Sequence, residues 1–349
     1  MKRHLLFLYI FLIFNPLHAQ TIEGSLYDAA TKEAISGAMV YLNGTSIYST
    51  SDKEGFFRLV VEGQINTTLV IRHLSYETIT VDNPYDHIEN VFYLIEKVNR
   101  LTEAQVVADR FSRSEKMAIF KEQFLGENRG GKSCVILNEE EIVLKFDNDT
   151  KKLVGFANNP IMIENKYLAY LIIFDLHNFT IQYASNTLSK SEIENFSISG
   201  TCALIDQSPN NRIIANRRNE IYRRSRQCFW RNFIAHTLKE AKFRMYNHYK
   251  QIEIGQYFIV TDTLSHTVVR VRPGTNINKV SNYLKNREIF GEVSISYNNR
   301  FDSKAIFLTD QFSVDRFGNI NVPGNVLFVG DMGQQRIGDM LPLDFLYTP

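Results

Sequence analysis

One stretch of the chain has the residue types and spacing of a phosphate-binding loop. Gly126-Glu-Asn-Arg-Gly-Gly131-Lys132-Ser133 fits the pattern G-x-x-x-x-G-K-S. In a nucleotide-binding protein the backbone amides of such a loop surround the phosphates, and the motif needs a buried strand before it and a helix after it. Here a helix-like segment, 120–125, precedes the stretch and a strand-like segment, 135–137, follows it. Because this order is reversed, we interpret residues 126–133 as a glycine-rich connector.

Histidines and cysteines offer the other candidates for catalysis or metal binding. A zinc carboxypeptidase needs a His and a Glu three residues apart plus a distant His, and none of the eight histidines has Glu three positions later. His87 and Glu89 are two apart, which is too few ligands for zinc, and we interpret them as a solvated edge. Cys228 and His236 would be about 12 Å apart along a helix, too far for a hydrogen bond. The sequence also has no G-x-S-x-G motif. It therefore predicts no catalytic residue, no metal and no cofactor.

A run of arginines with interleaved aromatic residues lies between residues 212 and 231. Such a pattern is typical of a surface that binds nucleic acid, anionic glycan or lipid headgroups. The interpretation that we favour is a solvated helix face whose arginines pair with carboxylates. Among ligands, an anionic envelope polymer fits an exported protein better than nucleic acid does. The candidate face for an anionic ligand consists of Arg217, Arg223, Arg224 and Trp230, within a run that also holds Arg212, Arg218, Arg226 and Arg231.

The N-terminus has the three-part pattern of a secretory signal peptide. Lys2 and Arg3 precede the apolar run Leu5–Phe14, and Ala19 offers a small residue at a cleavage point before Gln20. The run is shorter than the roughly 20 residues that a membrane-spanning helix needs. We therefore expect residues 1–19 to be a signal peptide. The mature protein would then be periplasmic, associated with the outer membrane, or extracellular.

Composition indicates a β-rich globular protein of about two domains. The chain has 349 residues, of which 44% are hydrophobic and 22% charged, and 25 Phe and 17 Tyr favour pleated, half-buried surfaces. A net charge of +1 argues against nucleic acid as a partner. No later stretch is long and apolar enough for a transmembrane span. Cys134, Cys202 and Cys228 leave two alternatives open, which are one disulfide with a thiol left over, or three small buried hydrophobes.

Residues 20–98 alternate short strands with turn signals. Asn43-Gly44 is a hairpin-type dipeptide, and Asp52-Lys-Glu-Gly55 is a turn in which glycine supplies a positive φ. Together with the Gly37-Ala38 step, these segments resemble the carboxypeptidase-like regulatory domain. The resemblance implies a transthyretin-like or Ig-like β-sandwich without catalytic residues. This module occurs beside metallocarboxypeptidase domains and at the N-termini of nutrient transporters, in secreted proteins of the Bacteroidota type.

The rest of the chain is predicted to be a linker and a second domain. Residues 99–125 form the linker and a short helix, with Met117, Phe120 and Phe124 on one helix face. Residues 126–349 form a β-rich α+β domain with one long helical segment, from Asn216 to about Tyr246. Its segments, of which Gly330–Phe345 is the most specific, resemble an uncharacterised domain that follows the regulatory module in such proteins.

The fold class expected is therefore mainly β, with an N-terminal sandwich followed by an α+β domain. The favoured function is an exported, non-catalytic cell-envelope protein that binds a glycan or a protein, such as an outer-membrane protein. One alternative is a hydrolase of unknown type in the C-terminal domain, because paired carboxylates are not recognisable without distances. A second alternative is an accessory subunit of an outer-membrane nutrient transporter.

Overall fold

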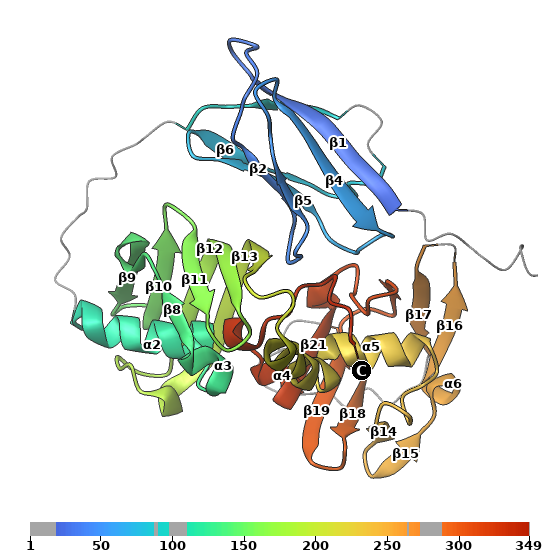
Figure 1. Ribbon diagram of the computed structural model, residues 1–349. Coiled ribbons are helices and arrows are strands. Elements are labelled where there is room, and N and C mark those ends of the chain that lie inside the picture. The colour runs from blue at the N-terminus through green and yellow to red at the C-terminus, as the bar shows by residue number, and fades with distance from the viewer. Residues whose placement is uncertain (1–18, 87–89, 98–109, 264, 273–287, 349) are drawn as a thin grey trace, which may run out of the picture.

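The computed structural model describes residues 19–86, 90–97, 110–263, 265–272 and 288–348. Within them the chain is mostly strands, arranged in five sheets with a few helices (Figure 1). The mainly β class expected from the sequence is confirmed. The predicted signal peptide, the His87–Glu89 pair and most of the predicted linker lie outside the described residues, apart from Ala19 at the end of the signal peptide.

The N-terminal residues fold into a β-sandwich, as predicted. Its two sheets have the strand orders β4-β1-β7 and β3-β2-β5-β6. Alternate residues of β4, such as Phe57 and Leu59, are buried between the sheets. The predicted turn is formed by Asp52, whose carboxylate accepts the amides of Glu54 and Phe56, while Gly55 has φ 78°. The strands are β1 Ala19–Asp28, β2 Met39–Leu42, β3 Tyr48–Thr50, β4 Phe56–Glu62, β5 Leu69–His73, β6 Tyr76–Val81 and β7 Val91–Leu94.

A second core lies between helix α2 and a six-stranded sheet. Ser112 caps α2 with a reciprocal capping box to Glu115. The predicted face is confirmed, because Phe120 and Phe124 are fully buried and pack on Phe179 and Phe174 of the sheet. The elements are α2 Arg113–Leu125, α3 Arg129–Lys132, β8 Cys134–Ile136, η1 Glu139–Glu141, β9 Ile142–Asp147, β10 Lys152–Ala157, β11 Ile161–Asn165, β12 Tyr170–Tyr183, η2 Lys190–Glu192 and β13 Ile193–Asp206.

A third core surrounds helix α5, between the sheets β15-β14-β18-β19-β21 and β16-β17-β20. The predicted helical segment consists of two helices, because Ser225 interrupts it and caps α5 through the amide of Cys228. Its last part is strand β14. The elements are α4 Arg212–Arg223, α5 Arg226–Ile234, β14 Phe243–Asn247, β15 Lys250–Ile252, α6 Ile254–Tyr257, β16 Phe258–Asp262, β17 Thr267–Val271, β18 Gly291–Tyr297, β19 Phe301–Phe307, β20 Gln311–Val314, η4 Pro323–Asn325, β21 Val326–Gly330, η5 Asp331–Gln334 and η6 Ile337–Asp339.

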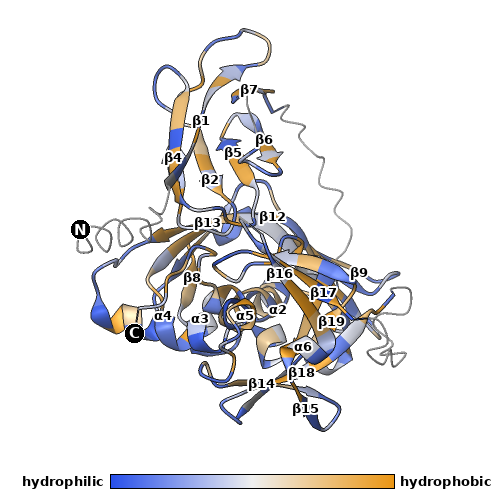
Figure 2. Cartoon of the chain, turned by 90° about the vertical axis from the view of Figure 1, so that its right-hand side faces the viewer, coloured by the Kyte–Doolittle hydropathy of each residue, from blue (hydrophilic) through white to orange (hydrophobic). Residues whose placement is uncertain are grey.

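The sandwich is docked on the rest of the molecule, with β12 and β13 at the junction (Figure 2). Its β2–β3 turn meets β13 through two backbone hydrogen bonds, from Gly44 to the Cys202 carbonyl (2.7 Å) and from Leu204 to the Thr45 carbonyl (3.0 Å). Phe317, which follows strand β20 of the third core, is buried in the sandwich core. The contacts therefore fix the sandwich in place relative to both other cores.

Candidate functional site

A hollow of about 640 Å³ lies on the outer face of the sheet that contains β14, β18, β19 and β21. Cross-strand register places Tyr246 of β14 beside Ser294 of β18, and Ser294 beside Lys304 of β19. One pair further along, Ser296 lies beside Asp302. The outward positions of the central strand therefore carry small side chains between larger ones. We call this surface the β18 trough; its residues are Tyr246, His248, Tyr249, Ser294, Ser296, Asp302 and Lys304.

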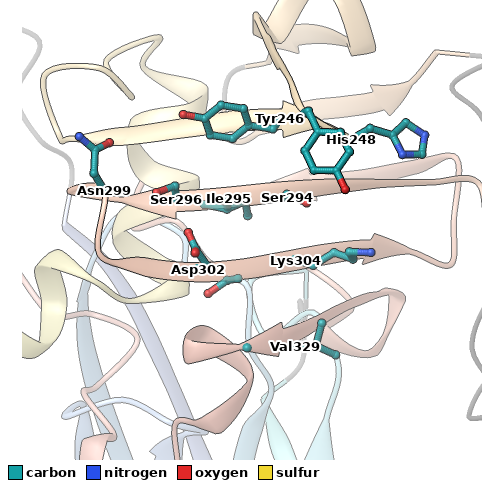
Figure 3. A pocket seen from close by; sticks show the side chains of 12 residues that line it. Tyr246, His248, Ser294, Ile295, Ser296, Asn299, Asp302, Lys304 and Val329 are labelled. Carbon is teal, nitrogen blue, oxygen red and sulfur yellow. The ribbon is translucent and has the colours of Figure 1, made fainter.

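One wall of the trough is aromatic. Tyr246 and His248 stand on one side of the strand that bears Ser294 and Ser296, and Asp302 and Lys304 stand on the other (Figure 3). Tyr249, at the tip of the β14–β15 hairpin, is fully exposed. His248 has φ 52°, a conformation that costs energy for a residue with a side chain. The positive φ of His248 belongs to a tight two-residue hairpin turn, since Asn247 pairs with Lys250, and this turn holds the Tyr249 ring in solvent beside the trough.

The opposite wall is charged and carries more carboxylates than cations. Lys304 forms an ion pair with Glu292 at 3.0 Å, and both side chains are partly exposed. The Asp302 amide donates to the carboxylate of Asp331 at 2.7 Å. No group of three or more His, Cys, Asp or Glu side chains that could hold a metal occurs among the described residues. The trough thus supplies hydroxyls, one ammonium, carboxylates and aromatic faces, which are groups suited to binding a polar ligand.

The four residues of the predicted anionic-ligand face do not share a surface. Trp230 is buried in the third core, packed edge-on against Phe233 and Phe312, so its inclusion was wrong. A helical pattern shows which residues share a face, but only the tertiary fold decides which face is covered, and here α5 lies between two sheets. Only 1% of the Trp230 surface is exposed.

The three arginines of that face have different surroundings. Arg223 is exposed and donates from Nε and a terminal nitrogen to the Tyr347 hydroxyl, at 3.1 and 2.8 Å, which raises its pKa. Arg224 is half-buried, and its charge acts on the carboxyl group of Asp339. Burial raises the pKa of that carboxyl, and the charge of Arg224 opposes the rise. Arg217 lies on the ring of Tyr167.

The phosphate-loop spacing has a structural explanation. Helix α2 precedes residues 126–133 and strand β8 follows them, the reverse of the order in a nucleotide-binding loop. A Cβ on Gly130 would clash with the Gly338 carbonyl, and one on Gly131 with the Gly126 carbonyl. These glycines therefore permit close backbone packing.

The three cysteines are free thiols in the structure. Burial is the main cause that raises their pKa values, to about 12 for Cys134 and Cys202 and to about 11 for Cys228. Such thiols are mostly protonated at neutral pH and are poor nucleophiles. They therefore pack as small hydrophobic side chains.

Comparison with known families bears on the sandwich. Residues 22–107 match the family model of the CarboxypepD_reg-like domain. This part of the chain is a CarboxypepD_reg-like domain. No curated protein matches the chain. In the part of the chain that the structure describes, no helix has both the length and the apolar character needed to cross a membrane.

The trough residues were not predicted from the sequence. The alternation Val293, Ile295, Tyr297 is visible there, and it marks the inward row of β18. The outward row consists of Glu292, Ser294 and Ser296, which give no signal on their own. Only the register that brings Tyr246 and Lys304 beside Ser294 makes them a site.

Proposed function

We propose that this protein is an exported, non-catalytic cell-envelope protein that binds a glycan along the β18 trough. The observation that carries the proposal is the fully exposed ring of Tyr249 beside a floor formed by Ser294 and Ser296. The trough is an open hollow of about 640 Å³ on the face of a sheet, so a ligand would lie along it without being enclosed. The signal-peptide pattern of residues 1–19 supports export.

The chemistry of the trough favours a glycan over a protein partner. A sugar ring has an apolar C–H face and a rim of hydroxyls, so it can pack on a tyrosine ring and donate to or accept from serine, aspartate and lysine groups. A protein interface usually needs an apolar, fully buried centre. The centre of this trough is the polar pair Ser294 and Ser296. We therefore assign the aromatic wall to ring packing and the serine floor with Asp302 to hydroxyl recognition.

The CarboxypepD_reg-like domain is assigned a positioning role. It is usually a non-catalytic module, and here its β2–β3 turn is joined to β13 and to the chain near Leu343. The module therefore holds the other two units together while the trough stays on the solvent side of its sheet. This division predicts that trough substitutions change binding without changing how the sandwich is docked.

A glycan array probed with purified protein tests the proposal. The wild type should bind a subset of glycans, and Tyr249→Ala should weaken that binding by about tenfold or more, as expected for an aromatic anchor. Because Tyr249 is fully exposed, the melting temperature of the Tyr249→Ala protein should equal that of the wild type. Tyr48→Ala is the matched control, since Tyr48 is an exposed tyrosine on β3 of the sandwich. Equal losses for both variants, or a wild type that binds no glycan, would contradict the proposal.

A further inference from the structure

Two arginines from distant parts of the chain lie on one tyrosine. The guanidinium carbons of Arg129, from α3, and Arg217, from α4, are each 5.0 Å from the ring centroid of Tyr167. The two cations are therefore at most about 10 Å apart. Tyr167 is only 8% exposed, while Arg129 is exposed and Arg217 half-buried. The two arginines thus contact one buried ring from nearer the surface.

The segment that carries Arg129 is held rigidly. Gly130 packs against the backbone of Gly338 so closely that a Cβ would not fit. The same Gly338 accepts a hydrogen bond from the fully buried Asn165 side chain at 3.1 Å. The Asn165 oxygen in turn accepts the amide of Tyr167 at 3.1 Å. Gly338 is therefore a common anchor for the helix of Arg129 and the turn of Tyr167.

The helix that carries Arg217 is fixed to the same turn. Arg218, its neighbour, is buried, donates to the Leu168 carbonyl at 2.8 Å and forms a two-pronged ion pair with Asp206 at 2.7 Å. Arg217 itself donates to the Tyr167 carbonyl at 3.2 Å. Arg217 is thus oriented before any ligand arrives, and the backbone that carries Arg129 is fixed, which lowers the entropy cost of binding.

Within the described residues, neither arginine of this pair forms an ion pair with a carboxylate. Three nearby carboxylates are engaged elsewhere: Glu127 with Lys190, Glu164 with Lys166, and Asp206 with Arg218. Glu220, one turn after Arg217, forms no ion pair in the described part of the chain. An arginine has five N–H donors. Toward the residues that the structure describes, one of the ten donors in this pair makes a hydrogen bond, from Arg217 to the Tyr167 carbonyl. The remaining donors are available to an anion.

We propose that Arg129 and Arg217 form a site for phosphate or sulfate groups of an anionic polysaccharide. This goes beyond the glycan binding assigned to the β18 trough, and it rests on different residues. Guanidinium groups recognise such oxyanions through paired hydrogen bonds, which a lysine cannot reproduce. The proposal also joins two features of the sequence, the phosphate-loop spacing of Gly126–Ser133 and the arginine run that includes α4. Both segments place an arginine on Tyr167, and neither is assigned to a nucleotide.

Calorimetric titration with dextran sulfate tests this site, with neutral dextran as the uncharged reference. The wild type should bind dextran sulfate, and its affinity should fall between about 50 and 200 mM salt. Arg129→Ala and Arg217→Ala should each weaken binding by about tenfold or more. Arg129→Lys, which keeps the charge, should also weaken it. Lys132→Ala is the matched control, because it removes an exposed cation three residues from Arg129, and it should stay within about twofold.

Three outcomes would overturn the proposal. The first is a wild type that does not bind dextran sulfate at low salt. The second is an equal loss for Lys132→Ala and Arg129→Ala, which would indicate diffuse attraction without a defined pair. The third is binding to vesicles of phosphatidylcholine with phosphatidylglycerol but not to dextran sulfate, which would assign the arginines to a lipid headgroup. Melting temperatures measured in parallel separate loss of binding from loss of folding.

Discussion

Arg72 and Asp175 form an ion pair at 2.8 Å that joins strand β5 of the sandwich to strand β12 of the central sheet. Only 13% and 19% of the two side chains are exposed. Beside the pair, the Tyr41 hydroxyl is 3.2 Å from that of Thr201, and burial raises the pKa of this tyrosine. The CarboxypepD_reg-like domain is thus bound through a partly dry, polar interface.

Arg72→Ala should lower the free energy of unfolding by about 2 kcal/mol or more, because it leaves a partly buried carboxylate without its partner. Glu23→Ala is the control, since its pair with Arg58 is 47–60% exposed and such pairs contribute less than about 1 kcal/mol. Urea denaturation measures both. Equal effects of the two substitutions would show that the interface ion pair does not hold the sandwich.

Stability should decrease in acid partly because of Asp206. Burial acts to raise the pKa of this carboxyl, but hydrogen bonds from Arg218 and from the Ser208 amide outweigh it and hold the pKa below the ordinary 3.8. A carboxyl with a depressed folded-state pKa stabilises the fold above its unfolded pKa, and that stability is lost as pH falls through the folded pKa. The wild type should therefore lose stability between about pH 5 and pH 2.

Asp206→Asn should make that loss smaller, in addition to lowering stability at neutral pH. Denaturation at several pH values measures the slope. Asp149→Asn, at an exposed turn position, is the control. A slope unchanged in Asp206→Asn would mean that the pair with Arg218 does not contribute to acid sensitivity.

The glycines of the phosphate-loop pattern should matter for stability, and its lysine should not. Gly131→Ala should cost about 1–3 kcal/mol, as overpacking does, because its new methyl group would clash with the Gly126 carbonyl. Lys132→Ala should stay within about 0.5 kcal/mol. Gly255→Ala is the glycine control, since it has open space around it. Stabilisation by ATP that disappears in Lys132→Ala would instead support a nucleotide site.

Export with cleavage near Ala19 is expected from the Lys2-Arg3 start and the apolar run Leu5–Phe14. Strand β1 pairs from this point onward, with Gln20 opposite Val61, so a chain beginning at Gln20 keeps the strand. Mass spectrometry of protein from its native cells should find an N-terminus at or near Gln20. Recovery of the chain with Met1 intact from the cytoplasm would contradict export.

Local signals made the sandwich and helix α2 predictable. The turn of Asp52 and Gly55 depends on hydrogen bonds within five residues, and the face of Phe120 and Phe124 depends on helical spacing. Trp230 was misplaced because its neighbours, such as Phe312, are far away in the sequence. Local pattern therefore predicts elements well, and it does not predict which face of α5 is covered.

The two proposed sites could not be predicted for the same reason. The trough needs Tyr246 beside Ser294, and the arginine pair needs Arg129 and Arg217 on Tyr167. These contacts join residues about 40 to 50 positions apart, an outcome of sheet register and backbone packing at Gly338. The basic residues themselves were visible in the sequence, but their common contact was not.

The most direct test of the glycan-binding claim is a glycan array probed with wild type, Ser294→Trp and Ser199→Trp. The first substitution fills the floor of the trough, and the second places the same bulk on an exposed position of β13. We predict that Ser294→Trp abolishes the glycan binding of the wild type while Ser199→Trp retains it, with all three proteins folded. Wild-type binding that persists in Ser294→Trp would contradict the assignment of the trough.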